Sequence, residues 1–522
     1  MGFPFRSESF REGIVLSTAF SIGAKAVAFL VNPAIAFYFG ANASTDVYFF
    51  CLSAVSVLAG FVTSLSSSVL IPHSTHLLIQ RGARDSQAFL NFFLYAYCAL
   101  TLGLMAIALV APEAVLGTIS RFGPKVVSSH ATLIRCFGVV LCLMTVSSLL
   151  TDILFSYRYF TVPMICSGAT SALSLVILIT LHGSLGMLCV PVAMLLAQTL
   201  QVVLLMLTMK RALGWNFRLV SSAKAGEIRR DLAVSYLGSA GSALTYYLPS
   251  LLMSGFGAGT LTALSYAQSA ANIPGVLLTS QYSAVAGIKL NELCARRDYD
   301  GVNRVFVAAA NLLHFLLIPV ACLMALLSRE IVVVLFHRGM TTAETIGASA
   351  AFLGILVFQA PLHALNTLSA RLFMADRQIA FSVWYQIAFS ALLFGSIWGM
   401  VAWIGPLGYP TALVVLYSMN LVALIWILGW RFPFLQYSGV LRSGAWLLLV
   451  NAALLALAYG MLELAVGVAP MIRIGLVTAV YLAALAVLNG RFRLNADAAQ
   501  LVRAAWTVGF SRLSRSSLAM TF

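Results

Sequence analysis

Charged residues are scarce in this sequence. Asp, Glu, Lys and Arg make up 9% of its 522 residues, whereas soluble globular domains carry about 25%. Hydrophobic residues make up 61%, and the mean hydropathy is +0.96. Such a chain has too few polar groups to cover a surface in water, and it is too apolar to stay disordered. The composition therefore excludes soluble enzymes and nucleic-acid-binding proteins, and it predicts a membrane protein.

Motifs for catalysis and metal binding are also missing. The 8 cysteines form no CxxC pair and the 7 histidines have no metal-ligand spacing, so we expect no disulfide and no metal site. The glycine-rich segment GFGAGT at 255–260 lacks the lysine of a phosphate-binding P-loop. Asp298 and Asp300 resemble the DxD pair of metal-dependent sugar transferases, but they lie in a short charged loop. We therefore expect neither an enzyme nor a cofactor.

What the sequence does contain is long apolar runs. A helix needs about 20 apolar residues to cross about 30 Å of hydrocarbon, and about fourteen windows meet this requirement. The sequence thus predicts an all-α polytopic membrane protein with about 14 transmembrane helices. The windows are 13–39, 45–72, 88–111, 130–156, 161–182, 186–209, 232–255, 262–288, 305–328, 342–369, 380–403, 408–429, 442–464 and 470–489.

The positive charges indicate the orientation. The 31 Lys and Arg residues outnumber the 16 acidic residues, which gives a formal charge of +15. When the windows alternate across the membrane, most of these cations fall on the side of the N-terminus, as the positive-inside rule requires of cytoplasmic segments. We therefore expect both termini in the cytoplasm. Topology and attraction to anionic lipids explain the basic excess, so we expect no nucleic-acid partner.

A basic connection at about 210–231 separates the first six apolar windows from the windows that follow. It predicts an N-terminal six-helix lobe at 1–210, a second six-helix lobe at 211–431 and an additional helix pair at 432–490. Residues 491–522 combine an apolar helical face with arginines, which favours a cytoplasmic amphipathic helix; a partly ordered tail is the alternative. A weak repeat at an offset of 215 supports two lobes, since it pairs Ser68 with Ser283, Leu78 with Leu293, Arg81 with Arg296 and Asp85 with Asp300.

Polar residues follow a helical period in the first two windows of each lobe. Because polar side chains are costly in hydrocarbon, we expect them to face a wet cavity or other helices. We predict that these stripes line a central hydrophilic cavity; ordinary helix packing through small residues is the alternative. The stripes are Ser21, Lys25 and Asn32; Asp46, Ser53, Ser56, Gly60, Ser64 and Ser67; Ser235, Ser239, Ser242 and Tyr246; and Gln268, Asn272, Gly275, Thr279 and Ser283.

Lys25 is the most informative of these residues, since a full charge at a helix centre costs about 2.5–3.5 kcal/mol. That cost favours an anionic partner, which is Asp46, Asp152 or the phosphate of a ligand. Asp46 also suits the positive end of a helix dipole. Asp152 is a candidate ion or proton site, or a hydrated residue near the inner interface. His363 is a second candidate for such a site, although a lone buried histidine is more often a hydrogen-bonded core residue.

Several segments resemble the MurJ/MviN lipid II flippases of the multidrug/oligosaccharidyl-lipid/polysaccharide (MOP) exporter superfamily. FGANASTDVYF at 39–49 is similar to the FG…DAF segment of that family, and Pro72 closes the second window. The segment 272–275 resembles the family's LPxG motif, and ARLFMAD at 370–376 resembles R-x-FYA. These matches follow the family's order and span essentially the whole chain, so the chain resembles a divergent member.

The resemblance implies a fold and a transport activity. The fold is a V-shaped pair of pseudo-symmetric six-helix bundles that enclose a cavity, with an extra helix pair for a polyprenyl tail. The activity is the outward movement of a polyprenyl-diphosphate-linked glycan, lipid II or a related cell-envelope or polysaccharide precursor, across the bacterial inner membrane by alternating access. We expect a monomer whose partners are this substrate, membrane lipids and cell-envelope synthesis enzymes. Coupling to Na⁺, H⁺ or the membrane potential stays open.

The resemblance also carries over site residues. Among the positions of the family's cavity arginines, Lys25 keeps a positive charge, whereas Val31 and Asn32 replace an Arg–Asp pair and Gln268 and Ser269 replace an Asp–Arg pair. Fewer cations hold a diphosphate less firmly, which leaves other lipid-linked saccharides open. An ion-coupled multidrug exporter and a membrane glycan polymerase are two further alternatives. The expected substrate-binding residues are Lys25, Asn32, Asp46, Ser53, Ser242, Gln268, Ser269 and Asn272.

Overall fold

The computed structural model describes residues 10–157, 159–218, 229–337, 339–376, 378–465, 467–492 and Asn495, and these residues form helices and short connections. The amphipathic helix expected in the tail lies almost entirely outside them. The chain is divided into two compact units. The first comprises residues 1–266, 336–348 and 386–409, and the second comprises 267–335, 349–385 and 410–522. The expected lobes at 1–210 and 211–431 remain a prediction, and each unit is described by itself.

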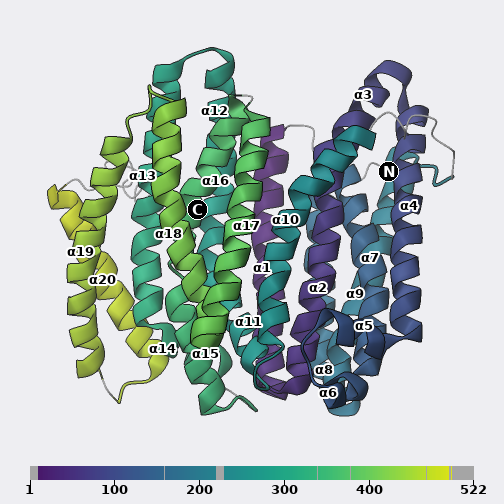
Figure 1. Cartoon of the computed structure of the whole chain (residues 1–522), viewed down its shortest axis with the longest axis horizontal. Coiled ribbons are helices and arrows are strands. Elements are labelled where there is room, and N and C mark those ends of the chain that lie inside the picture. Colours follow the sequence, from purple (N-terminus) through teal and green to yellow (C-terminus); the bar gives the residue numbers. More distant parts are fainter. Residues whose placement is uncertain are drawn as a thin grey trace, which may run out of the picture. The chain divides into compact units, whose positions relative to one another are not determined.

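The first unit consists mainly of long helices. They are α1 (Phe10–Phe39), α2 (Ala43–Leu65), α3 (Ile71–Arg81), α4 (Ala83–Val110), α5 (Pro112–Ile119), α6 (Pro124–Ser129), α7 (Ala131–Ser156), α8 (Thr161–Leu185), α9 (Cys189–Leu213) and α10 (Arg229–Met253). α7 lies at the centre and packs against α2, α4 and α9, while α8 packs against α1 and α9 (Figure 1). α10 packs on α2.

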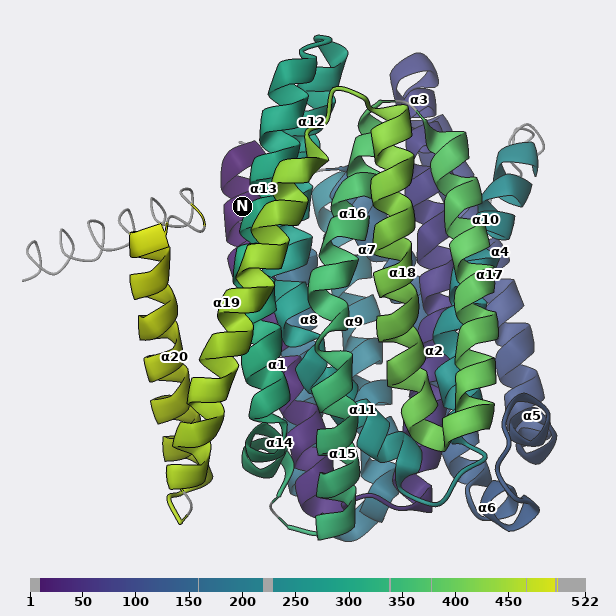
Figure 2. The same ribbon diagram turned by 60° about the vertical axis from the view of Figure 1, so that its left-hand side comes forward.

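Five helices pass from one unit into the other. They are α11 (Thr260–Ala271), α14 (Ser328–Phe336), α15 (Ala343–Leu356), α17 (Ile379–Ile404) and α18 (Gly408–Arg431). The rest of the second unit is α12 (Ser280–Ala295), α13 (Tyr299–Leu326), α16 (Gln359–Ala375), α19 (Tyr437–Leu464) and α20 (Pro470–Phe492). α13 packs against α12, α16 and α19. The expected additional helix pair is α19 and α20, which form a hairpin (Figure 2).

Two helices contain a wide π-helical turn. The first turn is Ser66–Leu70 (η1), between α2 and α3, and the second is Gly275–Thr279 (η4), between α11 and α12. A π-turn holds more residues than an α-turn, so the helical faces before and after it are out of register. We expected the polar stripes to follow one α-helical period through both segments, and that part of the prediction is wrong.

Ten stretches of described helix are long and apolar enough to cross a membrane. Three of them, of 53, 51 and 33 residues, each contain two long helices. The 53- and 51-residue stretches break at Gly186 (φ +54°) and Gly405 (φ +73°), where a side chain would strain the backbone. Every expected window contains helix, which confirms the all-α polytopic fold.

Each unit buries an apolar core and exposes further apolar residues. Phe89 and Leu149 are buried in the first unit, and Phe306 and Leu372 in the second. Trp403, Trp426, Trp430 and Leu464 are among the many large apolar side chains that are exposed. Apolar surface on this scale is unfavourable in water, and it suits contact with lipid chains.

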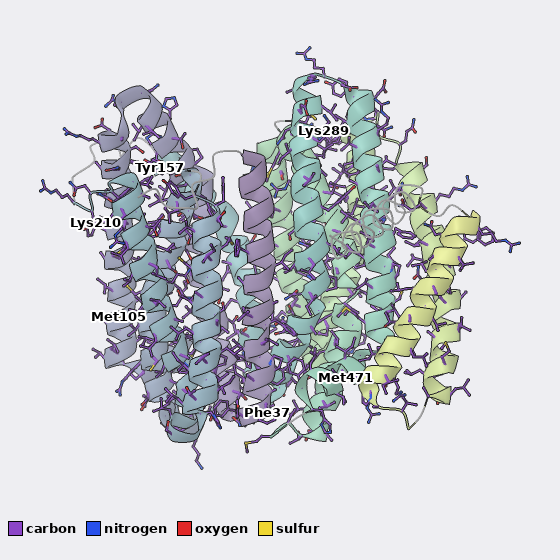
Figure 3. The ribbon with its side chains drawn as sticks, turned by 180° about the vertical axis from the view of Figure 1, so that it is seen from behind. Phe37, Met105, Tyr157, Lys210, Lys289 and Met471 are labelled. Carbon is purple, nitrogen blue, oxygen red and sulfur yellow. The ribbon has the colours of Figure 1, made fainter. Side chains whose placement is uncertain are left out.

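The two ends of each unit can be followed in Figure 3. In the first unit, Phe37 lies at the opposite end from Tyr157 and Lys210, and in the second unit Lys289 lies at the opposite end from Met471. The end with Tyr157 and Lys210 is the one we expect to face the cytoplasm. There Trp215, just after α9, donates its indole N–H to Asn91 Oδ1 of α4 at 2.9 Å. The start of the basic connection is therefore fixed to the bundle.

The hairpin of α19 and α20 is attached at its tip by an ion pair. The guanidinium of Arg473 in α20 lies 3.4 Å from Glu330 of α14, and it also donates to the carbonyl of Leu462 at 3.2 Å. The two side chains are 20% and 10% exposed. Further along the hairpin, the hydroxyl of Tyr481 donates to the buried amide oxygen of Asn451. These contacts fix the position of α20 within the second unit.

Candidate functional site

A buried carboxylate joins the two halves of the sequence. Asp46 lies in the first turn of α2 and is 3% exposed. Its Oδ2 accepts a hydrogen bond from the amide of Gly259 at 2.6 Å. Its Oδ1 accepts hydrogen bonds from the amide and the hydroxyl of Thr262, at 2.8 and 2.6 Å. Thr45 Oγ1 lies 3.0 Å from the same hydroxyl. We call Thr45, Asp46, Gly259 and Thr262 the Asp46 cluster.

The Asp46 cluster caps the start of α11. The first amides of a helix have no partner within it and carry a partial positive charge, so a carboxylate is well suited to that position. The amide of Gly259 comes from the segment GFGAGT, in which Gly259 adopts a φ of +91°, and the amide of Thr262 follows that segment by two residues. This segment is not a P-loop, as we expected, but it binds an anion by the same physics. That anion belongs to a residue 213 positions earlier in the chain.

Tyr266 extends the same contact region. Its hydroxyl donates to the carbonyl of Gly40 at 2.9 Å, and its side chain is fully buried. Its ring stacks on Phe336 with the centroids 4.7 Å apart, and it meets Phe49 edge-on at 5.6 Å. The connection between α1 and α2 is therefore held from two sides.

Two glycines make a backbone contact next to Tyr266. The amide of Met340 donates to the carbonyl of Phe37 at 3.1 Å. A Cβ on Gly339 would lie 1.8 Å from that carbonyl oxygen, and a Cβ on Gly40 would lie 2.4 Å from the carbonyl oxygen of Met340. Both glycines have positive φ, +77° and +66°. We call Phe37, Gly40, Gly339 and Met340 the glycine clasp. It lies at the end of the first unit that we expect to be extracytoplasmic.

The polar stripes of α2 and α10 meet each other. Ser250 Oγ donates to Ser53 Oγ at 2.8 Å, and the hydroxyls of Ser64 and Ser239 are 2.7 Å apart. At these positions the serines connect two helices, as the packing alternative predicts. Between them on α2, Ser56 and Gly60 are exposed. Ser242 of α10 accepts a hydrogen bond from Gln386 of α17 at 3.1 Å.

Lys25 is exposed on α1 and has no ion-pair partner among the described residues. Asp46 and Asp152, two of the three anionic partners considered, therefore form no ion pair with Lys25, and the phosphate of a ligand is the remaining alternative. The packing of α1 gives the reason: its main neighbour is α8, and Ala24 is buried there, 3.4 Å from the position of a Cβ on Gly168. This contact fixes the rotation of α1 and leaves Lys25 off the packed face. Asn32, further along α1, is half-buried.

The expected site residues of the second unit differ in exposure. Gln268 and Ser269 are half-buried in α11, and Asn272 is exposed just after it. At the last residue of the π-turn begun by Gly275, and one turn beyond it, the hydroxyls of Thr279 and Ser283 are buried. The residues before and after the turn therefore do not form one exposed stripe.

The two expected ion or proton sites lie in different surroundings. Asp152 of α7 lines a cavity beside α9. His363 of α16 lies edge-on to the ring of Tyr417, with the centroids 5.6 Å apart. On the next turn, Asn366 accepts a hydrogen bond from Asn420 at 3.4 Å, and Asn420 accepts one from Tyr385 at 2.5 Å. Among the described residues, no group of His, Cys, Asp and Glu is arranged to hold a metal ion.

Sequence reasoning missed several residues of these contacts. Ser250 continues the stripe of α10 one turn beyond Tyr246, so its spacing was a usable signal. Gly259 and Thr262 lie in or next to the glycine-rich segment, but nothing local identifies Asp46 as its anion. Gly339 had no signal, because its role depends on a backbone contact with a distant segment.

Comparison with known families identifies the type of protein. The family model described as "Lipid II flippase MurJ" matches residues 35–474. The chain belongs to the MurJ family. This membership confirms the resemblance seen in the sequence, places the protein in the MOP superfamily and makes it a membrane transporter, not an enzyme. Comparison with curated protein sequences gives no significant match.

Solved structures agree with MurJ membership at the level of the fold. A structure titled "Lipid II flippase MurJ, inward closed conformation" matches with a TM-score of 0.78 and 14% identity, over 92% of this chain and 99% of that one. A MATE-family multidrug transporter of the MOP superfamily in an inward-facing conformation gives a TM-score of 0.63 at 14% identity, over 80% and 94%. An outward-facing MATE structure gives 0.57 at 13% identity, over 82% and 97%.

Proposed function

We propose that this protein is an inner-membrane flippase that carries a polyprenyl-diphosphate-linked glycan from the cytoplasmic to the periplasmic face by alternating access. Lipid II is the first candidate substrate. Membership of the MurJ family over residues 35–474 supports the substrate class. The observation that carries the mechanism is the Asp46 cluster, in which a helix of the first half is bonded to a helix of the second half.

A transporter of this kind needs a closure that is firm in one state and can open in another. The Asp46 cluster is buried and made of charge-assisted hydrogen bonds, which are stronger than neutral ones. It contains no covalent link, and water or other donors can replace each partner when the helices separate. The cluster therefore suits a gate at the expected extracytoplasmic end, which opens when the substrate headgroup is released.

Lys25 is our candidate for the headgroup cation. An exposed ammonium group in a membrane helix, without an ion pair among the described residues, is costly unless it meets an anion or water. A diphosphate is an anion with several acceptor oxygens, so it is a suitable partner for the ammonium group of Lys25. The half-buried amide of Asn32, on the same helix, would then bind a neutral part of the headgroup.

The test uses a bacterium whose own lipid II flippase can be switched off. Expression of this protein should restore growth, and the purified protein in vesicles should move fluorescent lipid II between the leaflets. Lys25→Ala should lose both activities at equal expression, and Lys25→Arg should keep most of them. If the wild-type protein restores neither growth nor lipid II movement, lipid II is not its substrate. If drug susceptibility changes instead, the protein is a drug exporter and the proposal fails.

A further inference from the structure

A small cavity that opens to the surface lies between α7 and α9 in the first unit. Its volume is about 160 Å³, and every side chain that lines it carries oxygen. A water molecule occupies about 30 Å³ of liquid volume, so the cavity has room for an ion with part of its hydration shell. The lining residues are Ser147, Ser148, Thr151, Asp152 and Gln201.

Asp152 lacks the partners that a carboxylate in a membrane protein needs. Its Oδ2 is buried and accepts no hydrogen bond from the described residues. The three ion pairs of the described residues do not include it. A carboxylate oxygen that is buried without compensation is unfavourable, and either a proton or a bound cation removes that cost.

The neighbouring hydroxyl group of Ser147 donates its hydrogen to groups of the two helices. The Ser147 hydroxyl donates to the carbonyl of Met144 at 3.0 Å or to Gln198 Oε1 on α9 at 3.2 Å. The hydroxyl hydrogen is therefore engaged by an acceptor on α7 or α9, and the oxygen keeps lone pairs that a cation can bind. Gln201 lines the cavity from α9, which packs on α7.

We propose that this cavity binds a small monovalent cation, for which Na⁺ is the probe. Hard cations take oxygen ligands, and the cavity supplies one carboxylate and neutral oxygens from hydroxyl and amide groups. A single negative charge balances a monovalent ion, whereas a divalent ion would keep an uncompensated charge. Asp152 supplies the charge, and Ser148, Thr151 and Gln201 complete the coordination together with water.

A cation site here would add a coupling ion to the proposed transport function, and this role of the site rests on that proposed function. α7 packs directly on α2, the helix that begins with Asp46. A cation that fixes α7 to α9 therefore acts on a neighbour of the gate. It drives transport only if it binds more tightly in one state of the gate than in the other. Binding itself requires no substrate, so it is measured separately.

The experiment measures Na⁺ binding to the purified full-length protein in lipid nanodiscs, without any lipid-linked sugar. At pH 8, radioactive sodium should bind at about one ion per protein, and NaCl should raise the thermal unfolding temperature above that in choline chloride of equal ionic strength. Asp152→Asn, which keeps the size of the side chain, should weaken Na⁺ binding at least about tenfold. Gln201→Leu and Ser148→Ala should weaken it less.

Asp85→Asn is the matched control, because Asp85 is exposed in the first turn of α4 and lies outside the cavity. It should bind Na⁺ as the wild type does. The proposal is overturned if the wild type shows no Na⁺ binding up to high millimolar concentration, or if Asp152→Asn binds as well as the wild type. A site that responds to pH but not to Na⁺ also overturns it. Failure of lipid II transport with intact Na⁺ binding would instead count against the proposed function.

Discussion

The carboxylate of Asp46 binds both the amide and the hydroxyl of Thr262, a residue 216 positions later in the chain. One side chain thereby supplies two acceptor positions for the first turn of a helix in the other half of the sequence. A helix start is normally capped by a residue just before it. Here the cap is supplied by another helix, so the end of α11 is fully capped only while α2 is in contact with it.

Asp46→Ala should destabilise the protein by about 1–3 kcal/mol, because it leaves the amides of Gly259 and Thr262 buried without an acceptor. The measurement is thermal unfolding of the purified protein, and transport should fall in parallel. Asp46→Asn should be milder, since one oxygen remains. The exposed Asp85, changed to Asn, provides the reference. Equal stability of Asp46→Ala and the wild type would show that the cluster does not hold the helices together.

Gly339→Ala should weaken the glycine clasp. The new methyl group would lie 1.8 Å from the carbonyl oxygen of Phe37, and a φ of +77° is unfavourable for alanine. We expect a lower unfolding temperature and a loss of transport. Gly347→Ala is the matched control, because Gly347 lies in α15 with no atom within 4 Å of its added Cβ. Alanine there should stabilise the helix by about 0.5–1 kcal/mol. Similar behaviour of the two variants would contradict the role of the clasp.

Lys25 should matter for transport and not for folding. It is exposed and forms no ion pair among the described residues, so Lys25→Ala and Lys25→Glu should unfold at the wild-type temperature. Both variants should lose substrate movement, with Lys25→Glu the more severe because it repels a diphosphate. Vesicle transport and growth of the depleted strain provide the readouts. Wild-type export by both variants would remove Lys25 from the mechanism.

The ion pair between Glu330 and Arg473 should stabilise the hairpin of α19 and α20. Its side chains are mostly buried, so a double-mutant cycle with Glu330→Gln and Arg473→Met should give a coupling energy of about 1 kcal/mol or more. Arg473→Met should cost more than Glu330→Gln, because Arg473 also binds the carbonyl of Leu462. Additive effects in the cycle would show that the ion pair contributes nothing by itself.

The sequence was sufficient for the membrane fold because hydropathy acts over whole windows. Each predicted window contains helix, and the predicted extra pair is the hairpin of α19 and α20. The sequence was less informative about which residues share one face of a helix. The π-turns at Ser66–Leu70 and Gly275–Thr279 shift the faces beyond them, and no local residue pattern announces one surplus residue in a turn.

Contacts between distant segments were the least predictable part of the site. The cost of a charge in hydrocarbon indicated that Lys25 has an anionic partner. Within the protein, Asp46 and Asp152 were the available carboxylates. The packing of side chains decides which face of a helix meets which neighbour. For α1, the contact of Ala24 with α8 decides this orientation. Asp46 was correctly associated with a positive helix end, but that end belongs to α11 as well as to its own helix.

The anion bound by GFGAGT is part of the same molecule, and this determines what can displace it. A tethered group competes at an effective concentration of millimolar or more, and Asp46 is also shielded from water. Dissolved phosphate or chloride therefore cannot loosen this junction by simple competition, and changes in salt should leave it intact. Only a movement of the helices themselves can separate the acid from its amides, so the junction responds to what is bound inside the protein and not to the ions outside it.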